Sequence, residues 1–354
     1  MKSFTYTGQP ARVIFGSGTL SRLAAEIERL GCGRALVLST PEQADHAREV
    51  MSRIGGAAAG LFDGAAMHTP VSVTEKAMKT VADLGADCTL AIGGGSTIGL
   101  GKAIALRTDL PQICVPTTYA GSEMTPILGE TANGVKKTQR TLKVLPEVVV
   151  YDVDLTLSLP PALSATSGMN ALAHAAEALY AEDRNPVISL MAEEAVSALA
   201  RALPDVVADG SNRATRSDAL YGAWLCGVCL GSVGMALHHK LCHVLGGTFD
   251  LPHAQTHTIV LPHAIAYNAP AAPEAMAALS RALGADEPGR ALFDLAGGLG
   301  APRALRDIGM PEDGIARAVD LALENPYWNP RRIERDTIHE LITRAWAGEP
   351  PEAG

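Results

Sequence analysis

Histidines crowd into the second half of this sequence at spacings that suit one shared site. Seven of the ten histidines lie between positions 174 and 263, more than an even distribution would place there. Asn170 and His174 would share one face of a helix, as would His239 and His243, while His253 follows a Leu-Pro step. Because imidazole can ligate a metal ion, donate a hydrogen bond or transfer a proton, the cluster predicts a site for either a metal ion or a substrate oxygen atom. For any one of these histidines, an ordinary place in the core or on the surface is the alternative.

Three consecutive glycines form the sharpest motif in the first half. They follow the apolar residues 90–92 and lead into a helical pattern. Glycine lets backbone N–H groups approach an anion closely, and the amino terminus of the following helix adds a positive dipole end. The turn therefore predicts binding of a pyrophosphate, with a glycine-rich turn that holds no ligand as the alternative.

A second loop, at residues 116–123, follows the next predicted strand and would lie at the same edge of a parallel sheet. Its hydroxyl and backbone donors, beside the glycine turn, are typical of a dinucleotide site, while a turn that only caps a helix is the alternative. Ser39 and Thr40 stand where such a site often has an acid that holds the adenosine ribose, so both NADH and NADPH are predicted to serve. The predicted cofactor-binding residues are Ser39, Gly93, Gly94, Gly95, Ser96, Thr117, Thr118, Tyr119 and Ser122.

The elements that would position these residues change in kind near residue 160. Before that point, short apolar runs alternate with helical patterns, which predicts a mostly parallel sheet covered by helices. After it, long Ala- and Leu-rich stretches predict an all-helical half. We therefore predict an α/β dinucleotide-binding domain over residues 1–160, an all-α substrate domain over residues 161–354, and an active site in the cleft between them. The predicted strands cover residues 34–39, a run near 61, 88–92 and 112–115, and the predicted helices cover 42–54, 71–85, 96–107, 162–181, 187–203, 216–237 and 274–283.

The composition of the 354 residues limits the kinds of partner. The chain carries 38 acidic and 29 basic residues, a net charge of −9 and no block of Lys and Arg, which argues against nucleic acid and membrane surfaces and favours a small molecule. Because 47% of the residues are apolar, disorder is excluded. The uncharged residues 219–237 predict a buried helix rather than a membrane span.

The six cysteines sit mostly inside apolar runs, and the amino terminus shows no signal pattern. A reducing compartment, most simply the cytoplasm, is therefore expected. Cys226 and Cys229 form a lone CxxC motif without a second pair, so buried and inert thiols are predicted there.

Taken in order, these motifs resemble the iron-containing (group III) alcohol dehydrogenase family over nearly the whole chain. The resemblance rests on the glycine turn followed by Lys102, the loop at residues 116–123, the Asn170 and His174 pair and the histidines at 239, 243 and 253. It implies the dehydroquinate synthase-like fold of that family, an α/β domain followed by an all-α domain, and a homodimer. Within the family, residues 237–243 and 324–331 are similar to those of enzymes that reduce maleylacetate.

Two positions depart from the pattern of the alcohol dehydrogenases. Gly99 replaces an aspartate that is usual in the helix after the glycine turn, and Asn170 stands where the family has a metal-binding aspartate. Without that carboxylate, Asn170, His174, His239 and His253 offer only neutral ligands, and carboxylate charge is a large part of what holds a hard cation. A weak or vestigial metal site and no metal requirement are therefore expected.

The resemblance implies reduction of the conjugated double bond of maleylacetate to 3-oxoadipate, with the hydride of NADH or NADPH arriving at the alkene carbon remote from the ketone. Negative charge then develops on the ketone oxygen, and imidazole donors would stabilise it in place of a metal. His243 is the expected donor or general acid, assisted by His253, with His174 and His239 shaping the pocket. A metal-dependent alcohol dehydrogenase of the same family is the first alternative. A dehydroquinate synthase-like lyase, which leaves its nicotinamide unchanged over a turnover, is the second.

A dicarboxylate substrate also needs local positive charge in this acidic chain. Lys240 and Arg331 are predicted to bind its carboxylates, with a solvated surface charge as the alternative for both. Tyr119 and Trp328 are predicted to wall the pocket together with Asn170, and buried packing is the alternative for the two aromatic residues.

Overall fold

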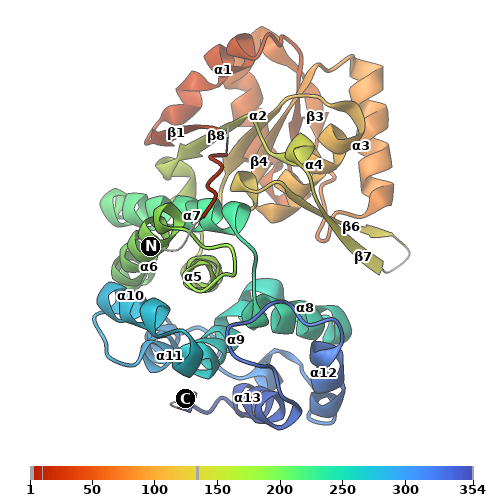
Figure 1. The fold of residues 1–354 in the computed structure, drawn as a ribbon. Helices are drawn as coiled ribbons and strands as arrows, with labels where there is room; N and C mark the ends of the chain where they lie inside the picture. The colour runs from red at the N-terminus through yellow and green to blue at the C-terminus, as the bar shows by residue number, and fades with distance from the viewer. Residues whose placement is uncertain (1–3, 10, 133–134, 353–354) are drawn as a thin grey trace. The chain divides into compact units, whose positions relative to one another are not determined.

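The computed structural model describes residues 4–9, 11–132 and 135–352 of the chain (Figure 1). Contacts within it group the residues into two compact units. One unit spans Gly8–Leu159, and the other consists of Pro160–Gly354 together with Met1–Thr7. Each unit has a hydrophobic core of its own.

A six-stranded parallel sheet forms the centre of the first unit. Its strands lie in the order β1-β8-β5-β4-β2-β3, and every neighbouring pair is parallel. The residues of β2, β4, β5 and β8 are buried throughout, as expected for strands covered by helices on both faces. The strands are β1 (Arg12–Gly16), β2 (Ala35–Leu38), β3 (Ala58–Phe62), β4 (Cys88–Gly93), β5 (Gln112–Pro116) and β8 (Val148–Asp152).

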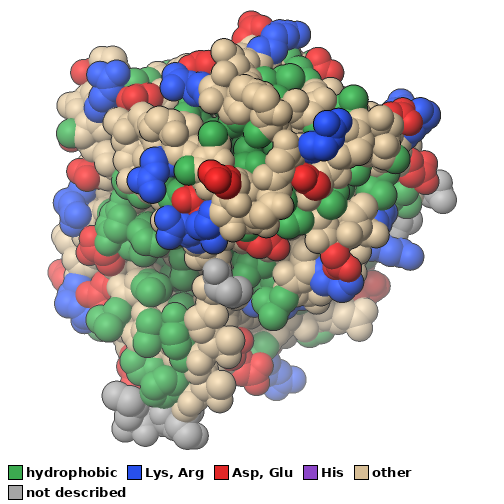
Figure 2. Space-filling view, turned by 90° about the horizontal axis from the view of Figure 1, so that it is seen from above, with side chains coloured by type: hydrophobic (Ala, Val, Ile, Leu, Met, Phe, Trp, Pro, Cys, Tyr) green, Lys and Arg blue, Asp and Glu red, His purple; other side chains and the backbone are tan. Residues whose placement is uncertain are grey.

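Helices connect the strands from β1 to β5, so the predicted α/β fold class is confirmed. The helices are α1 (Leu23–Arg29), α2 (Ala44–Ile54), α3 (Val71–Leu84) and α4 (Gly95–Thr108). The sequence patterns did not reveal β1, β8 or the antiparallel hairpin of β6 (Ile127–Ala132) and β7 (Val135–Arg140). On the face of the molecule shown in Figure 2, acidic and basic side chains are interspersed.

The second unit is helical, as predicted. Among the described residues, no strand follows β8. The helices are α5 (Pro161–Ala178), α6 (Pro186–Ala208), α7 (Arg213–Ser232), α8 (Leu237–Phe249), α9 (His253–Asn268), α10 (Pro273–Leu283), α11 (Pro288–Gly298), α12 (Gly314–Leu323) and α13 (Arg335–Ala347).

The single long helix predicted over residues 216–237 is wrong. The chain ends α7 at Ser232 and begins α8 at Leu237, and the two helices are bent by 94° relative to one another. Val233 is extended (φ −134°, ψ 167°) and a glycine follows it, so the helix stops there despite the apolar composition. In the described part of the chain, no single helix is long and apolar enough to cross a membrane, and only α7 and α8 taken together across their bend pass a test of length and composition.

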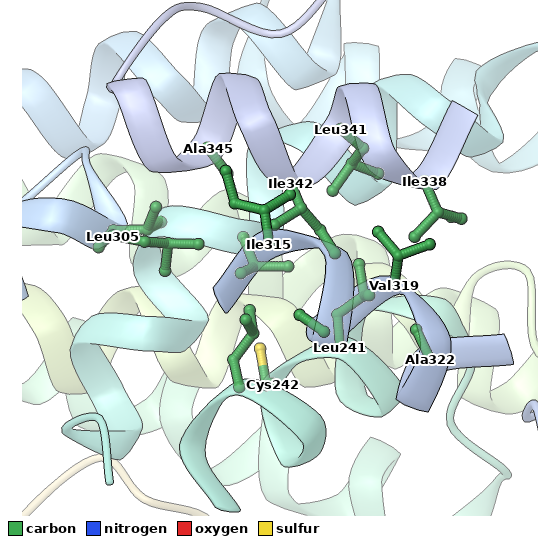
Figure 3. Packing of buried hydrophobic residues seen from close by; sticks show 14 of the residues in the cluster. Leu241, Cys242, Leu305, Ile315, Val319, Ala322, Ile338, Leu341, Ile342 and Ala345 are labelled. Carbon is green, nitrogen blue, oxygen red and sulfur yellow. The ribbon is translucent and has the colours of Figure 1, made fainter. Parts of the chain in front are cut away.

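The core of the helical unit sets the orientation of α8 (Figure 3). Leu241 and Cys242 of α8 lie buried in one cluster with Ile315 and Val319 of α12 and Ile342 of α13. Fully burying an aliphatic side chain contributes about 1.5–3 kcal/mol, so this packing opposes rotation of α8 about its axis. His239 and His243 lie two residues before and two residues after Leu241, about 160° around the helix from it. The two histidines therefore face away from Leu241 and its core contacts.

Candidate active site

The glycine turn is built so that only glycine fits at its first position. Gly93 has a φ of +150°, and a Cβ atom there would lie 2.5 Å from Oγ1 of Thr97 and 2.6 Å from Oε1 of Gln43. Gly94 is the N-cap of α4, and its carbonyl accepts the backbone N–H groups of Thr97 and Ile98. No neighbouring atom lies within 4 Å of the Cβ position at Gly95, so the amino terminus of α4 is open at this point.

The second predicted loop lies directly beside the glycine turn. Gly93 pairs with Pro116 across β4 and β5, and the Thr117 N–H donates to the Gly93 carbonyl at 3.1 Å. A Cβ atom at Gly94 would lie 3.2 Å from the Thr118 side chain. The two loops are therefore in contact, as predicted. β2 neighbours β4, so Ser39 follows a strand that ends at the same edge.

Two buried hydroxyl oxygens at this edge, of Ser39 and Thr97, have no hydrogen-bond partner. A buried unpaired polar atom costs free energy, so these hydroxyls suit a polar ligand. With the open helix terminus at Gly95, the residues present fit the diphosphate of NADH or NADPH. Tyr119, predicted to wall the pocket, is fully buried.

Lys102 of α4 is fully buried and holds the second loop in place. Its Nζ donates to the carbonyls of Ser122, Thr125 (2.7 Å) and Ile127 (2.9 Å), and it contacts Oγ1 of Thr125 at 2.9 Å. Burial lowers the pKa of the ammonium to about 8, and the nearby Cys114 and Glu123 oppose that shift. Lys102 therefore positions the loop that runs from Ser122 to Ile127.

Replacing Lys102 with methionine should destabilise the protein by about 3 kcal/mol, because the buried carbonyls lose their donor. The Kd for NADH, measured by fluorescence titration, should rise at least about tenfold as the loop relaxes, since positioning errors of this kind cost binding and rate. The control is Lys143→Met, which removes an exposed lysine paired with Asp109 and should change neither quantity. Native NADH affinity in Lys102→Met would contradict the positioning role.

The departure at Gly99 has a steric cause in this structure. A Cβ atom there would lie 2.4 Å from Oγ1 of Thr69. Thr69 itself has a φ of +45°, which is uncommon for a β-branched residue. An aspartate at position 99 would therefore require Thr69 and its loop to move.

The predicted histidines come together on α5, α8 and α9. The ring centroids of His174 and His239 are 5.3 Å apart, and those of His239 and His243 are 6.2 Å apart. The ring centroid of His257, for which the sequence predicted no role, lies 4.3 Å from that of His253 and 5.0 Å from that of His239. We call these residues and His238 the histidine cluster: His174, His238, His239, His243, His253 and His257.

Glu177, which was not predicted from the sequence, holds the start of α8 and the His239 ring in place. It is fully buried, and its carboxylate accepts the backbone N–H groups of Ala236 (3.0 Å) and His238 (2.8 Å). Oε2 also lies 2.6 Å from Nδ1 of His239. Because an ionised carboxylate only accepts hydrogen bonds, Nδ1 of His239 carries the proton and Nε2 presents a lone pair.

The imidazoles of His174, His238 and His257 are neutral at pH 7. Burial lowers the pKa of His174 well below its usual value, and the charges of His239 and His253 lower it further. Burial likewise lowers the pKa values of His238 and His257, with contributions from the neighbouring imidazoles. These rings therefore act as hydrogen-bonding groups rather than as cations.

The fit of a metal ion to this site depends on the donor atoms present. Oδ1 of Asn170, Nδ1 of His174 and Nε2 of His239 are buried and have no partner, so lone pairs are available, but all three groups are neutral. The nearby carboxylate of Glu177 is already committed to three N–H groups. Among the described residues, two groups of His, Cys, Asp or Glu have ligand atoms that all lie within 4.8 Å of one another. Neither group contains His174, His239 or His253. The donors therefore do not form the charged, convergent set that a tightly held iron needs.

His243 lies at the exposed side of the cluster, next to the segment at residues 324–332. Its Nδ1 is 3.0 Å from the hydroxyl oxygen of Tyr327, a residue that the sequence analysis did not identify. The same segment is held at its start, where Nζ of Lys240 donates to the Glu324 carbonyl at 2.7 Å. Burial and the charge of Glu177 raise the pKa of Tyr327, so its hydroxyl is protonated and available as a donor.

Arg331 and Trp328, both predicted to bind the substrate, contact residues outside the histidine cluster. The guanidinium of Arg331 donates to the Tyr267 carbonyl at 2.8 Å and lies over the Tyr267 ring, 4.5 Å from its centroid. Trp328 lines a pocket with Tyr180 and Arg184. Substrate binding by Arg331 and Trp328 stays a prediction, whereas the contacts described here anchor the segment at residues 324–332.

Two family descriptions match the chain. "Iron-containing alcohol dehydrogenase" matches residues 10–153, and "Fe-containing alcohol dehydrogenase family, C-terminal" matches residues 164–346. Together they cover both units.

Several characterised proteins are similar to the whole chain. The chain is 59% identical to the maleylacetate reductase of Sphingobium indicum over 348 residues, which are 98% of this chain and 99% of that protein. It is 55% identical to the maleylacetate reductase of a Rhizobium species over 352 residues, covering 99% and 100% of the two chains. The crystal structure of maleylacetate reductase from Agrobacterium tumefaciens is 56% identical and superposes with a TM-score of 0.97, covering 99% of this chain and all of that one.

Proposed function

Because the chain belongs to the iron-containing alcohol dehydrogenase family, we propose that it reduces the conjugated double bond of maleylacetate to give 3-oxoadipate, with NADH or NADPH as the hydride donor. The observation that carries this proposal is the pairing of His243 with Tyr327 at the exposed side of the histidine cluster, next to buried imidazoles such as that of His174. This arrangement supplies hydrogen-bond donors where a carbonyl oxygen gains negative charge. The identity of 51–59% to eight maleylacetate reductases over nearly the whole chain supports the same substrate.

The bound nicotinamide supplies a hydride to the alkene carbon remote from the ketone, and the electron pair of the double bond moves towards the ketone oxygen. The Tyr327 hydroxyl donates to Nδ1 of His243, so Nε2 of that ring carries the proton. As Nε2 passes this proton to the enolate oxygen, Nδ1 takes the proton of the Tyr327 hydroxyl, and the ring stays neutral. The enol then takes a proton from solvent at the carbon next to the ketone and returns its O–H proton through His243 to Tyr327, which restores the ketone. The net change is one hydride and one proton added across the double bond, with the ketone retained.

Asn170 has a role in this chemistry that an aspartate would not fill. Its amide offers N–H donors to a developing negative oxygen, whereas a carboxylate at the same buried place would repel that charge. Glu177 and His239 hold the neighbouring helices in register with Asn170 and His174. The substitution thus suits a site that works with hydrogen bonds, and we propose that the reaction requires no metal.

The proposal also covers the choice of cofactor, the residues that bind the substrate carboxylates, the compartment and the oligomeric state. Both NADH and NADPH are accepted, because Ser39 presents a hydroxyl rather than a carboxylate to the adenosine ribose. Lys240 binds one carboxylate of the substrate and Arg331 the other, and each must then leave its backbone acceptor, the carbonyl of Glu324 or of Tyr267. The enzyme works in the cytoplasm as a homodimer, and its six cysteines are free thiols, as a reducing compartment requires.

A substrate panel tests this proposal. Purified protein is mixed with NADH or NADPH and with maleylacetate, and the loss of the reduced nicotinamide absorbance is followed. We expect turnover with maleylacetate and none with simple alcohols and NAD⁺. Oxidation of simple alcohols would favour the metal-dependent alcohol dehydrogenase, and conversion of substrate without net change in the nicotinamide would favour the lyase.

The metal part of the proposal predicts a specific response to Asn170→Asp. In the absence of metal, this variant should lose about 10²–10³ in kcat, as expected when an oxyanion-stabilising donor is removed. Its affinity for Fe²⁺ or Zn²⁺ should rise at least about tenfold over that of the wild type, because the site gains a charged ligand. The wild type should keep its activity after EDTA treatment and dialysis. Loss of wild-type activity that added Fe²⁺ restores would refute the proposal.

A further inference from the structure

Two thiols and a carboxylate meet at the edge of the sheet where the strands begin, at the opposite end of β4 from the glycine turn. Cys88 is the first residue of β4, Asp87 precedes it, and Cys32 lies in the connection between α1 and β2. Ligand atoms of the three residues all lie within 4.8 Å of one another. The chemistry proposed above uses none of them.

The backbone around these side chains is fixed on both sides. Gly31, with a φ of +75°, ends α1, and the Cys32 N–H donates to the Ile27 carbonyl at 3.1 Å, which completes a helix-terminating motif. The Asp87 carboxylate accepts the N–H groups of Gly33 and Arg34, each at 2.9 Å. The ligand atoms are therefore held in place before any ion arrives, which lowers the entropic cost of binding.

The partial exposure of Cys32 suits entry of an ion from solvent. Five of the six cysteines are buried, and Cys32 is partly exposed. Sγ of Cys32 donates to the carbonyls of Leu30 (3.7 Å) and Asp87 (3.6 Å), as a protonated thiol does. Binding therefore replaces two S–H bonds by two metal–sulfur bonds and releases two protons to solvent, while Asp87 adds a third ligand.

We propose that Cys32, Asp87 and Cys88 bind a thiophilic divalent cation such as Zn²⁺, with water as the fourth ligand. Two thiolates and a carboxylate are a ligand set that tetrahedral zinc accepts, and soft sulfur ligands select against Mg²⁺ and Ca²⁺. The bound ion joins the α1–β2 connection to the start of β4. It therefore stabilises the α/β unit and takes no part in hydride transfer.

A second group of possible ligands, His238, Cys242 and His257, is less suited to this role. All three side chains are buried, and the two imidazoles already hydrogen bond to each other at 3.0 Å between Nε2 and Nδ1. An ion would have to break that bond and cross the packed helical core. The site at Cys32 loses only the weak contacts of its Sγ with the carbonyls of Leu30 (3.7 Å) and Asp87 (3.6 Å), and Cys32 is partly exposed, which is why we assign the cation to it.

Cobalt absorption and zinc content test the site directly. The protein is reduced, stripped with a chelator and titrated with Co²⁺, and the near-ultraviolet absorption from thiolate-to-cobalt charge transfer is recorded. Zn²⁺ is then added, excess ion is removed by gel filtration, and the zinc retained is measured by mass spectrometry. The variants are Cys32→Ser, Cys88→Ser and Asp87→Asn, and the matched controls are Cys226→Ser and Cys242→Ser.

We expect one thiolate-bound ion per wild-type chain and in both controls. Asp87→Asn should bind about 10–100-fold more weakly, and Cys32→Ser should show no charge-transfer band. Zinc at about 100 times its Kd should raise the thermal midpoint of the wild type by about 5 °C, but not that of Cys32→Ser. Because Cys32 is partly exposed, its variant is informative even if Cys88→Ser fails to fold.

Absence of the charge-transfer band in the wild type, its persistence in Cys32→Ser, or its loss in Cys242→Ser would each overturn the assignment. Maleylacetate turnover is measured in parallel on Cys32→Ser and should equal that of the wild type. The test of the metal site is thus independent of the test of the reductase activity.

Discussion

Replacing His243 with alanine is expected to lower kcat for maleylacetate by about 10²–10⁴-fold, the range that general acid catalysis contributes. The side chain is exposed, and its Nδ1 lies 3.0 Å from the Tyr327 hydroxyl oxygen. The Kd for NADH, measured by fluorescence titration, should therefore stay within about twofold, because the change removes an interaction made in the transition state. Steady-state kinetics with both substrates measure this split.

Two further variants make the result for His243 specific. Tyr327→Phe keeps the ring but removes the hydroxyl that fixes the imidazole tautomer, and it should cost about tenfold in kcat, near the net value of one hydrogen bond. His339→Ala removes an exposed histidine on α13 and should leave kcat unchanged. Normal turnover in His243→Ala would remove this residue from the proposed catalytic role.

Replacing Glu177 with glutamine is expected to cost about 2–4 kcal/mol of stability and to lower kcat as well. Both carboxylate oxygens accept hydrogen bonds from N–H groups, at Ala236, His238 and His239. A glutamine has one acceptor oxygen and an NH₂ group, so a donor would face a donor in a buried place, which costs about 1–3 kcal/mol for each unsatisfied group. Urea unfolding followed by circular dichroism measures the loss, and His239 loses its orientation at the same time.

A matched glutamate elsewhere provides the control for this variant. Glu193 pairs with Arg281 in an ion pair in which the Arg281 side chain is 62% exposed and the Glu193 side chain 31% exposed. Glu193→Gln should therefore cost no more than about 1 kcal/mol. Equal losses of stability for the two variants would show that the buried hydrogen bonds of Glu177 contribute no more than the partly exposed ion pair of Glu193.

The buried strands β2, β4 and β5 could be predicted because each is a continuous apolar run, whereas β8 (Val148–Asp152) has the same signature and was missed. The segment Cys88–Gly93 is an example, with all six residues buried. The partly exposed edge strand β1 has a shorter apolar run, and β7 contains two lysines and an arginine, so neither shows this signature. The break between α7 and α8 was missed because apolar composition continues through Val233 and the glycine after it.

The candidate site shows the same limit at the level of single residues. Asn170, His174, His239 and His243 could be predicted because a spacing of four residues is local information. Glu177 had a signal that went unused, since it is the only charged residue in α5 and lies three residues after His174. Tyr327 lies in the segment 324–331 that carries the family resemblance, but its contact with His243 spans 84 positions and depends on the path of the segment before α13.

Reduction with nicotinamide deuterated at the transferable position of C4 tests the central claim most directly. The protein converts maleylacetate with this cofactor, and NMR of the product locates the deuterium. The account predicts 3-oxoadipate with one deuterium on the carbon remote from the ketone, which does not exchange under these conditions, and an intact ketone. Deuterium on a carbinol carbon would show that the protein reduces the carbonyl group, as an alcohol dehydrogenase does, and would contradict conjugate reduction.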